Sequence, residues 1–155
     1  MFLSGMLAWG RTRVKTDSLV HRIRWLPATF WMGGIFYLSQ QSAPPGGDAG
    51  AHWSILAHLG LYTGLALLLF WALVGNGGGR LGTPLWALAT VTFALTVLYG
   101  ASDELHQAFI RGRTASEADI AVDAAGATLG IALAVLADGL IMIRRTRDGD
   151  SRHTH

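Results

Sequence analysis

Apolar stretches alternate with short polar breaks along the chain, and this pattern predicts four helices that cross a membrane. Two of the breaks contain residues that end helices: the Pro-Pro-Gly-Gly sequence within Ser39–Gly50, and the glycine-rich turn Asn76–Gly82. No internal repeat and no strand pattern lies between the apolar stretches. We therefore expect an all-α membrane protein, folded as an up-down bundle of four transmembrane helices. The expected spans are Trp25–Leu38, His52–Val74, Pro84–Ala101 and Ser116–Ile143.

The first expected span is short for a bilayer. A hydrocarbon core of roughly 30 Å needs about 20 helical residues, and Trp25–Leu38 provides fewer. Extension to Ser39, snorkelling of Arg22 and Arg24 to the interface, or local thinning of the bilayer would close the gap. Pro27 suits the first turn of this helix, because the N–H that proline lacks is not used there.

Composition supports a membrane protein and excludes several other classes. Charged residues make up 14% of the chain and apolar residues 51%, whereas a soluble domain has roughly 25% charged residues. The basic residues lie near the chain ends without interleaved aromatics, which disfavours nucleic acid as a partner. The absence of cysteine excludes disulfides, thiolate metal ligands and a cysteine nucleophile. Met1–Leu7 is too short for the apolar part of a signal peptide and no cleavage site follows it, so we expect no cleaved leader.

The distribution of lysine and arginine predicts the orientation of the bundle. With four spans, both termini share one side, which carries five basic residues before the first span, Arg80 in the second loop and four after the last span. The other side carries only two, in the loop between the last two spans. Because basic residues favour the cytoplasmic side, we expect both termini to be cytoplasmic and this last loop to face outward. Residues 1–24 are then a basic cytoplasmic segment, 25–143 the membrane domain and 144–155 a disordered cytoplasmic tail.

A polar cluster follows the third span and continues into the fourth. Ionisable side chains near hydrocarbon cost several kcal/mol unless they are paired or solvated, so this cluster is a candidate functional site. Helical spacing places Tyr99, Asp103 and His106 on one face, where a carboxylate beside an imidazole could transfer protons or hold a cation. A solvated helix end without a function is the alternative. The candidate site residues of this region are Asp103, Glu104, His106, Gln107, Arg113, Asp119 and Asp123.

The predicted topology adds candidates from the first two spans. The second span descends from the outer side and brings His58 and Tyr62 to the depth of the polar cluster. Ser39, at the end of the first span, is expected to lie at the rim of the same site. A packing role for His58 and a solvated loop at Ser39 are the alternatives.

Arg113 suits the binding of an anion. Its planar guanidinium can hold phosphate or carboxylate through two hydrogen bonds. Internal pairing with Asp119 or Asp103 explains the arginine equally well. Both interpretations hold if a ligand phosphate competes for the same side chain.

The stretch from Tyr99 to Gly130 contains the pattern YGxxDExHQxFxxGRxxxxxD followed by GxxxG, which resembles the signature of the VanZ-like family of small bacterial membrane proteins. The two glycines of GxxxG, Gly126 and Gly130, allow another helix to approach closely, which is a packing role. The resemblance covers about Trp25–Leu136 and implies a multi-pass protein of the bacterial inner membrane. It also implies a link to teicoplanin, because the type member of the family is associated with low-level resistance to this glycopeptide.

The chain matches the VanZ-like pattern at some positions and departs from it at others. His58 and Tyr62 match the histidine and tyrosine that the family has four residues apart. Asp123 lies where the family usually has asparagine. Ile55 lies where a lysine is expected, so a lysine contact to an anionic head group would be lost here or replaced by His52.

Three functions remain open from the sequence. In the first, which we favour, the pocket binds an anionic lipid or lipid-linked cell-envelope intermediate and influences teicoplanin susceptibility. In the second, the protein is a membrane hydrolase or transferase acting on a lipid-linked phosphate. There His106 would be the acid–base, Asp103 or Glu104 would orient it, and Arg113 would hold the phosphate. In the third, the protein is a non-catalytic homo-oligomer or an assembly partner of another membrane protein.

The sequence identifies no cofactor, and we expect no metal site. HExxH is absent, and one histidine among carboxylates suits hard, oxygen-preferring ions better than zinc. His58 and His106 could ligate haem within a bundle, but the surrounding carboxylates disfavour this.

Overall fold

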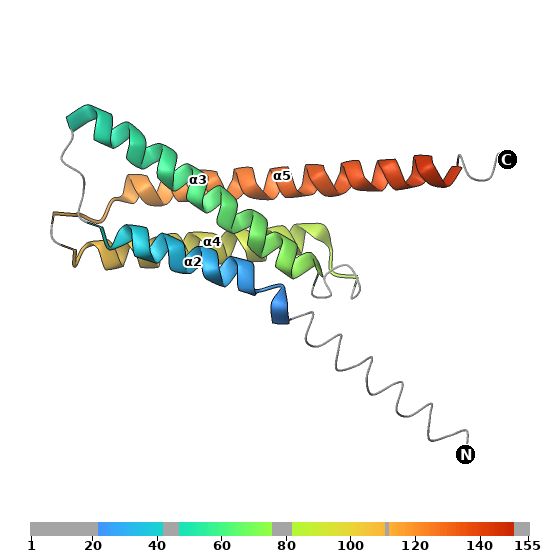
Figure 1. Cartoon of the computed structure of the whole chain (residues 1–155), viewed down its shortest axis with the longest axis horizontal. Coiled ribbons are helices and arrows are strands. Elements are labelled where there is room, and N and C mark those ends of the chain that lie inside the picture. The colour runs from blue at the N-terminus through green and yellow to red at the C-terminus, as the bar shows by residue number, and fades with distance from the viewer. Residues whose placement is uncertain (1–21, 42–46, 76–81, 111, 151–155) are drawn as a thin grey trace, which may run out of the picture.

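A computed structural model describes residues 22–41, 47–75, 82–110 and 112–150 of the chain. Within these residues the protein contains four long helices and no strand, which confirms the expected all-α class (Figure 1). The expectations for residues 1–21 and 151–155 concern parts of the chain outside the described residues. The helices are α2 (Leu26–Ser39), α3 (Gly47–Leu73), α4 (Leu85–Gln107) and α5 (Glu117–Asp150).

The four helices follow the expected order of the spans. Two of them, α3 and α4, extend further than expected at the end of the bundle that carries the polar cluster. α3 begins at Gly47, inside the segment expected to be a loop. α4 continues through the polar cluster to Gln107 without a break. This extension is stabilised within the helix, because Gln107 Nε2 donates to Asp103 Oδ2 one turn earlier, at 2.9 Å.

α5 is also longer than expected at its C-terminal end. It continues to Asp150 and extends beyond the other helices in Figure 1. Residues 144–150, which we expected to belong to a disordered tail, are thus part of α5. These residues include three arginines, and arginine is a good helix former.

Three of the four helices are long and apolar enough to cross a membrane. The candidate spans are His52–Leu73, Leu85–Gln107 and Glu117–Gly139. α2 has 14 residues, and at 1.5 Å per residue it is about 21 Å long. That length is below the roughly 30 Å of a hydrocarbon core, so α2 is not among the candidate spans.

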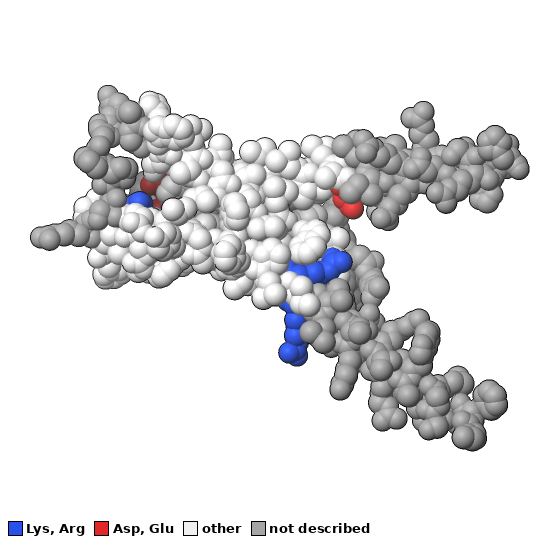
Figure 2. Space-filling model, in the orientation of Figure 1, with Lys and Arg blue, Asp and Glu red and all other residues white. Residues whose placement is uncertain are grey.

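The surface of the bundle is apolar between two charged ends. Large side chains point outward along the helices, with Phe30 84% exposed and Trp86 72% exposed. Figure 2 shows the same distribution, because its blue and red atoms lie near the ends of the described bundle and the band between them is white. Such a surface suits contact with lipid and would be costly in water.

The helices alternate in direction, so the end of α4 lies beside the end of α2 and the start of α5. Arg113 Nε, after α4, donates to the backbone carbonyl of Gln41, after α2, at 3.1 Å. The backbone N–H of Ser116, before α5, donates to Glu104 Oε2 on α4 at 2.9 Å. We call this end of the bundle, where α2 and α4 finish and α3 and α5 begin, the motif end (Figure 1).

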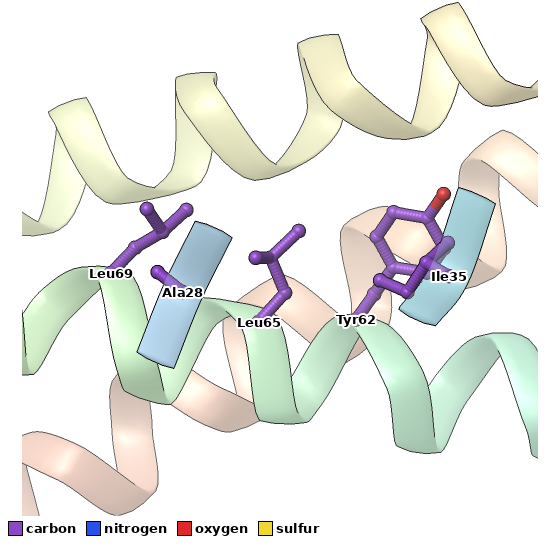
Figure 3. Packing of buried hydrophobic residues seen from close by; sticks show 5 residues of the cluster. All are labelled: Ala28, Ile35, Tyr62, Leu65 and Leu69. Carbon is purple, nitrogen blue, oxygen red and sulfur yellow. The ribbon is translucent and has the colours of Figure 1, made fainter. Parts of the chain in front are cut away.

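α3 forms the centre of the bundle. Its inward side chains pack against α2, in a cluster that Figure 3 shows around Tyr62 and Leu65. On its other side, α3 packs closely against α5, and few side-chain atoms lie between the two backbones. A Cβ atom added at Gly126 would lie 2.8 Å from the Leu59 carbonyl oxygen, and one at Gly130 would lie 2.5 Å from the Thr63 carbonyl oxygen. The predicted packing role of these glycines is confirmed.

Candidate functional site

A cavity of about 300 Å³ opens at the motif end between α2, α3 and the end of α4. Its walls are mainly apolar, with side chains such as Ile35 and Leu61. Six of the residues predicted from the sequence lie in its lining, and so this cavity is the candidate functional site. They are Ser39, His58, Tyr62, Asp103, Gln107 and Arg113.

Arg113 is held in the cavity wall by two neutral acceptors. Its Nη1 donates to Gln107 Oε1 at 2.7 Å, and its Nε donates to the Gln41 carbonyl at 3.1 Å. Gln107 in turn donates to Asp103 Oδ2 at 2.9 Å, so an amide separates the arginine from the carboxylate. The internal pairing of Arg113 with Asp103 or Asp119, which the sequence left open, does not form.

A second polar group lies deeper, where α3, α4 and α5 meet. His58 Nδ1 lies 2.9 Å from Asp123 Oδ1, and this is the one ion pair among the described residues. Asp123 is fully buried and His58 is nearly so. The carboxylate fits against α4 because Gly100 has no side chain; a Cβ atom there would lie 2.6 Å from Asp123 Oδ2.

Glu104 and Asp119 complete this deeper group. Glu104 is buried and accepts the Ser116 backbone N–H through Oε2. Ser116 Oγ accepts the Asp119 backbone N–H at 3.2 Å, so Ser116, where the last span was expected to begin, is the N-cap of α5. One ring nitrogen of His58 and one carboxylate oxygen each from Glu104 and Asp119 lie within 4.8 Å of one another. We call His58, Glu104, Asp119 and Asp123 the deep cluster.

The site contains several buried polar atoms that no described group satisfies. An unsatisfied buried polar atom costs roughly 1–3 kcal/mol, so their concentration in one region indicates capacity for hydrogen bonds to water, to a ligand or to an ion. They are Tyr62 Oη, Asp103 Oδ1, Glu104 Oε1 and Asp123 Oδ2; a fifth such atom, His106 Nε2, lies outside the cavity lining.

His106 lies apart from both polar groups. Its ring packs against Phe36 on α2 with the ring centroids 4.9 Å apart, and it is not part of the cavity lining. No hydrogen bond joins it to Asp103 or Glu104 among the described residues. Tyr99, one of its expected neighbours on the helix face, donates to the Met32 carbonyl on α2 at 2.6 Å. Tyr99 and His106 therefore help to attach α2 to α4.

Some residues of the site carried no signal in the sequence. Gln41 contributes a backbone carbonyl, which any residue could provide. Trp53 and Ser54 line the cavity from the first turns of the α3 span, where they are indistinguishable in sequence from residues that face lipid. Arg111, the other basic residue of the loop between the last two spans, lies outside the described residues.

Comparison with known proteins identifies a family. The family model described as VanZ/LLP1 matches residues 6–138, a range that includes the whole cavity and the deep cluster. No curated protein and no solved structure matches the chain.

Proposed function

The chain belongs to the VanZ/LLP1 family, and from this premise we propose that its cavity binds an anionic lipid or a lipid-linked cell-envelope intermediate. The observation that carries the proposal is the position of Arg113. A guanidinium held by neutral oxygens lies in the wall of a mainly apolar cavity. A ligand that has both an anionic group and an apolar chain complements this combination.

The hydrogen bonding of Arg113 leaves room for an anion. A guanidinium has five N–H donors, and the described residues accept from its Nε and Nη1. The remaining donors can bind phosphate or carboxylate oxygens, which form stronger hydrogen bonds with arginine than neutral acceptors do. Gln107 can then move its amide toward the ligand or keep its bond to Asp103.

The size and lining of the cavity limit what enters it. A volume of about 300 Å³ is at the lower end of ligand pockets, so it suits a head group and the first part of a chain. Leu38 and Trp53 line the cavity and are also exposed on the outer surface, 49% and 73% respectively. The rest of an acyl or prenyl chain can therefore lie along the outside of the bundle.

The finer topology also forms part of the proposal. We propose that α2 crosses the bilayer as a fourth, short span, that both termini are cytoplasmic and that the motif end faces outward from the inner membrane. The excess of basic residues on the side of the termini supports this orientation. A reporter inserted at Gly47 should then be external and one fused after Arg147 cytoplasmic; the opposite result at both sites would overturn the orientation.

Binding of an envelope intermediate provides a route to an antibiotic phenotype. Teicoplanin acts at the cell wall, so a protein that holds a lipid-linked intermediate in the outer leaflet would alter susceptibility to it. This part of the proposal follows from the resemblance described above. The enzyme hypothesis has less support, because His106, its proposed acid–base, does not line the cavity.

The test is to compare lipids that remain bound after gentle solubilisation. We expect the unmodified protein to retain an anionic lipid detectable by native mass spectrometry and Arg113→Ala to retain at least tenfold less. Arg22→Ala is the matched control, since it removes an arginine from an exposed position outside the cavity lining. Equal retention of lipid by all three proteins would overturn the proposal.

A further inference from the structure

We infer that the deep cluster is a binding site for a divalent transition-metal ion, with His58, Glu104 and Asp119 as ligands and Asp123 as the residue that orients His58. This site departs from the expectation of no metal site, and it uses His58 in place of the imidazole of the α4 polar cluster. Its members come from three helices and are far apart in the chain. Folding brings them together at the motif end beside the cavity.

The spacing of the three donor atoms suits one ion. They lie within 4.8 Å of one another. Three donors at that separation are at most about 2.8 Å from a common centre, whereas metal–ligand bonds are about 2.0–2.2 Å long. Side-chain movements of less than about 1 Å therefore bring all three donors into coordination distance.

The contact between His58 and Asp123 prepares the imidazole for a metal. Metal-binding histidines commonly donate their second ring N–H to a carboxylate, which fixes the tautomer and the orientation of the ring. Here Nδ1 lies 2.9 Å from Asp123 Oδ1. When Nδ1 carries the proton, it donates a hydrogen bond to Asp123. The lone pair of Nε2 is then free to bind the ion.

Both carboxylate ligands also have free oxygens. Glu104 is only 1% exposed; its Oε2 accepts the Ser116 N–H while its Oε1 has no partner. Asp119 is the third residue of α5, and in a capping box this side chain would accept the N-cap N–H. Because Glu104 already accepts that N–H from Ser116, the Asp119 carboxylate is not needed for capping.

An independent observation is the unsatisfied oxygen of Asp123. The residue is 0% exposed, and its Oδ2 has no partner. Three carboxylates thus surround one imidazole, and Arg113, the nearest arginine in the described part of the site, bonds to Gln107 and Gln41 instead. A divalent cation would neutralise part of this negative charge, which is costly to bury otherwise.

The donor set indicates which ions to test. One imidazole and two carboxylates form a mixed nitrogen and oxygen set, which suits Mn²⁺ or Zn²⁺; zinc, which the sequence disfavoured, becomes a candidate because the contact with Asp123 orients the His58 ring as a ligand. Ca²⁺ and Mg²⁺ prefer all-oxygen sites, and the chain has no cysteine to select soft metals. Water would complete the coordination, since the three ligands leave positions open.

This inference does not rest on the proposed binding of a lipid. His58 lines the cavity as well as the deep cluster, so an ion there would lie next to the cavity. The two proposals involve different residues otherwise. Arg113→Ala should reduce retained lipid without reducing metal content, and a metal-site variant tests the ion alone.

The experiment measures metal bound to the full-length chain in detergent. The protein is made without a histidine tag and with His153 and His155 replaced by alanine in every sample, so that binding to the tail is not counted. After removal of metal with a chelator, Mn²⁺, Zn²⁺, Mg²⁺ and Ca²⁺ are titrated separately, and bound metal is quantified by elemental analysis. We expect one Mn²⁺ or Zn²⁺ per chain and binding of Mg²⁺ and Ca²⁺ at least tenfold weaker.

Variants decide whether the ion binds at the deep cluster. Asp119→Asn and Glu104→Gln should each weaken Mn²⁺ or Zn²⁺ binding at least tenfold, and Asp123→Asn should weaken it through the orientation of His58. Asp138→Asn, an exposed position of α5, is the matched control. Gel filtration and circular dichroism check that each variant folds; Asp119 is only partly buried, so its variant should fold normally. The same affinity in Asp119→Asn and Asp138→Asn, or no binding of either metal by the unmodified chain, would overturn the inference.

Discussion

The contact between α3 and α5 leads to a graded prediction for three glycine-to-alanine substitutions in one helix. The added Cβ atom would lie 2.8 Å from a backbone oxygen at Gly126 and 2.5 Å at Gly130, whereas nothing lies within 4 Å at Gly139. Ordinary contact begins at 3.4 Å, so the two backbones must separate by about 0.6 Å and about 0.9 Å. The obstructing atoms belong to the backbone and cannot rotate away.

The expected stabilities follow from two opposing contributions. Alanine stabilises a helix interior by roughly 0.8–1 kcal/mol relative to glycine, and this contribution is common to all three variants. Overpacking costs about 1–3 kcal/mol and applies only to Gly126 and Gly130. Relative to Gly139→Ala, we therefore expect Gly126→Ala to be about 1–2 kcal/mol less stable and Gly130→Ala about 2–3 kcal/mol less stable.

The measurement is reversible unfolding in mixed micelles of mild detergent and sodium dodecyl sulfate, followed by circular dichroism. Because a shift of α5 also moves Asp123 away from His58, the two destabilised variants should lose metal affinity as well. Equal unfolding free energies for the three alanine variants would refute the reasoning. That result would mean that the helices separate without cost and that the close approach does not stabilise the fold.

Three further predictions concern single contacts. His58→Ala and Asp123→Ala should be strongly non-additive in a double-mutant cycle of unfolding free energy, since each single change leaves the other side chain buried without its partner; additive effects would contradict the pairing. Tyr99→Phe should lower the unfolding free energy by about 0.5–1.5 kcal/mol through loss of its hydrogen bond to α2, and Tyr37→Phe, at an exposed site, should change it little. Ser116→Ala should cost about 0.5–2 kcal/mol through loss of the N-cap of α5, and an unchanged stability would show that the cap is dispensable.

The sequence predicted the parts of the fold that depend on local pattern. Apolar runs separated by glycine and proline gave the four helices, and Ser116 gave the start of the last one. Gly126 and Gly130 marked a close helix contact because small residues four apart line one face of a helix. Each of these inferences needs only residues that are neighbours in the chain.

The partners within the site could not be predicted, because they depend on the rotation of each helix about its axis. At about 100° per residue, His106 lies roughly 60° around α4 from Asp103, and Gln107 lies roughly 40° from it. The two lie on opposite sides of Asp103 and are therefore about 100° apart, and this separation directs Gln107 into the cavity and His106 against Phe36. The pairing of His58 with Asp123 likewise depends on how α5 packs on α3.

The exposure of Leu38 and Trp53 has a consequence for how a ligand reaches the cavity. Both side chains form part of the cavity wall and part of the outer surface of the bundle, so the interior of the cavity is continuous with the surroundings of the helices. A lipid ligand would enter sideways from the bilayer without passing through water. Occupancy would then depend on the mole fraction of that lipid in its leaflet, and its aqueous solubility would have no influence.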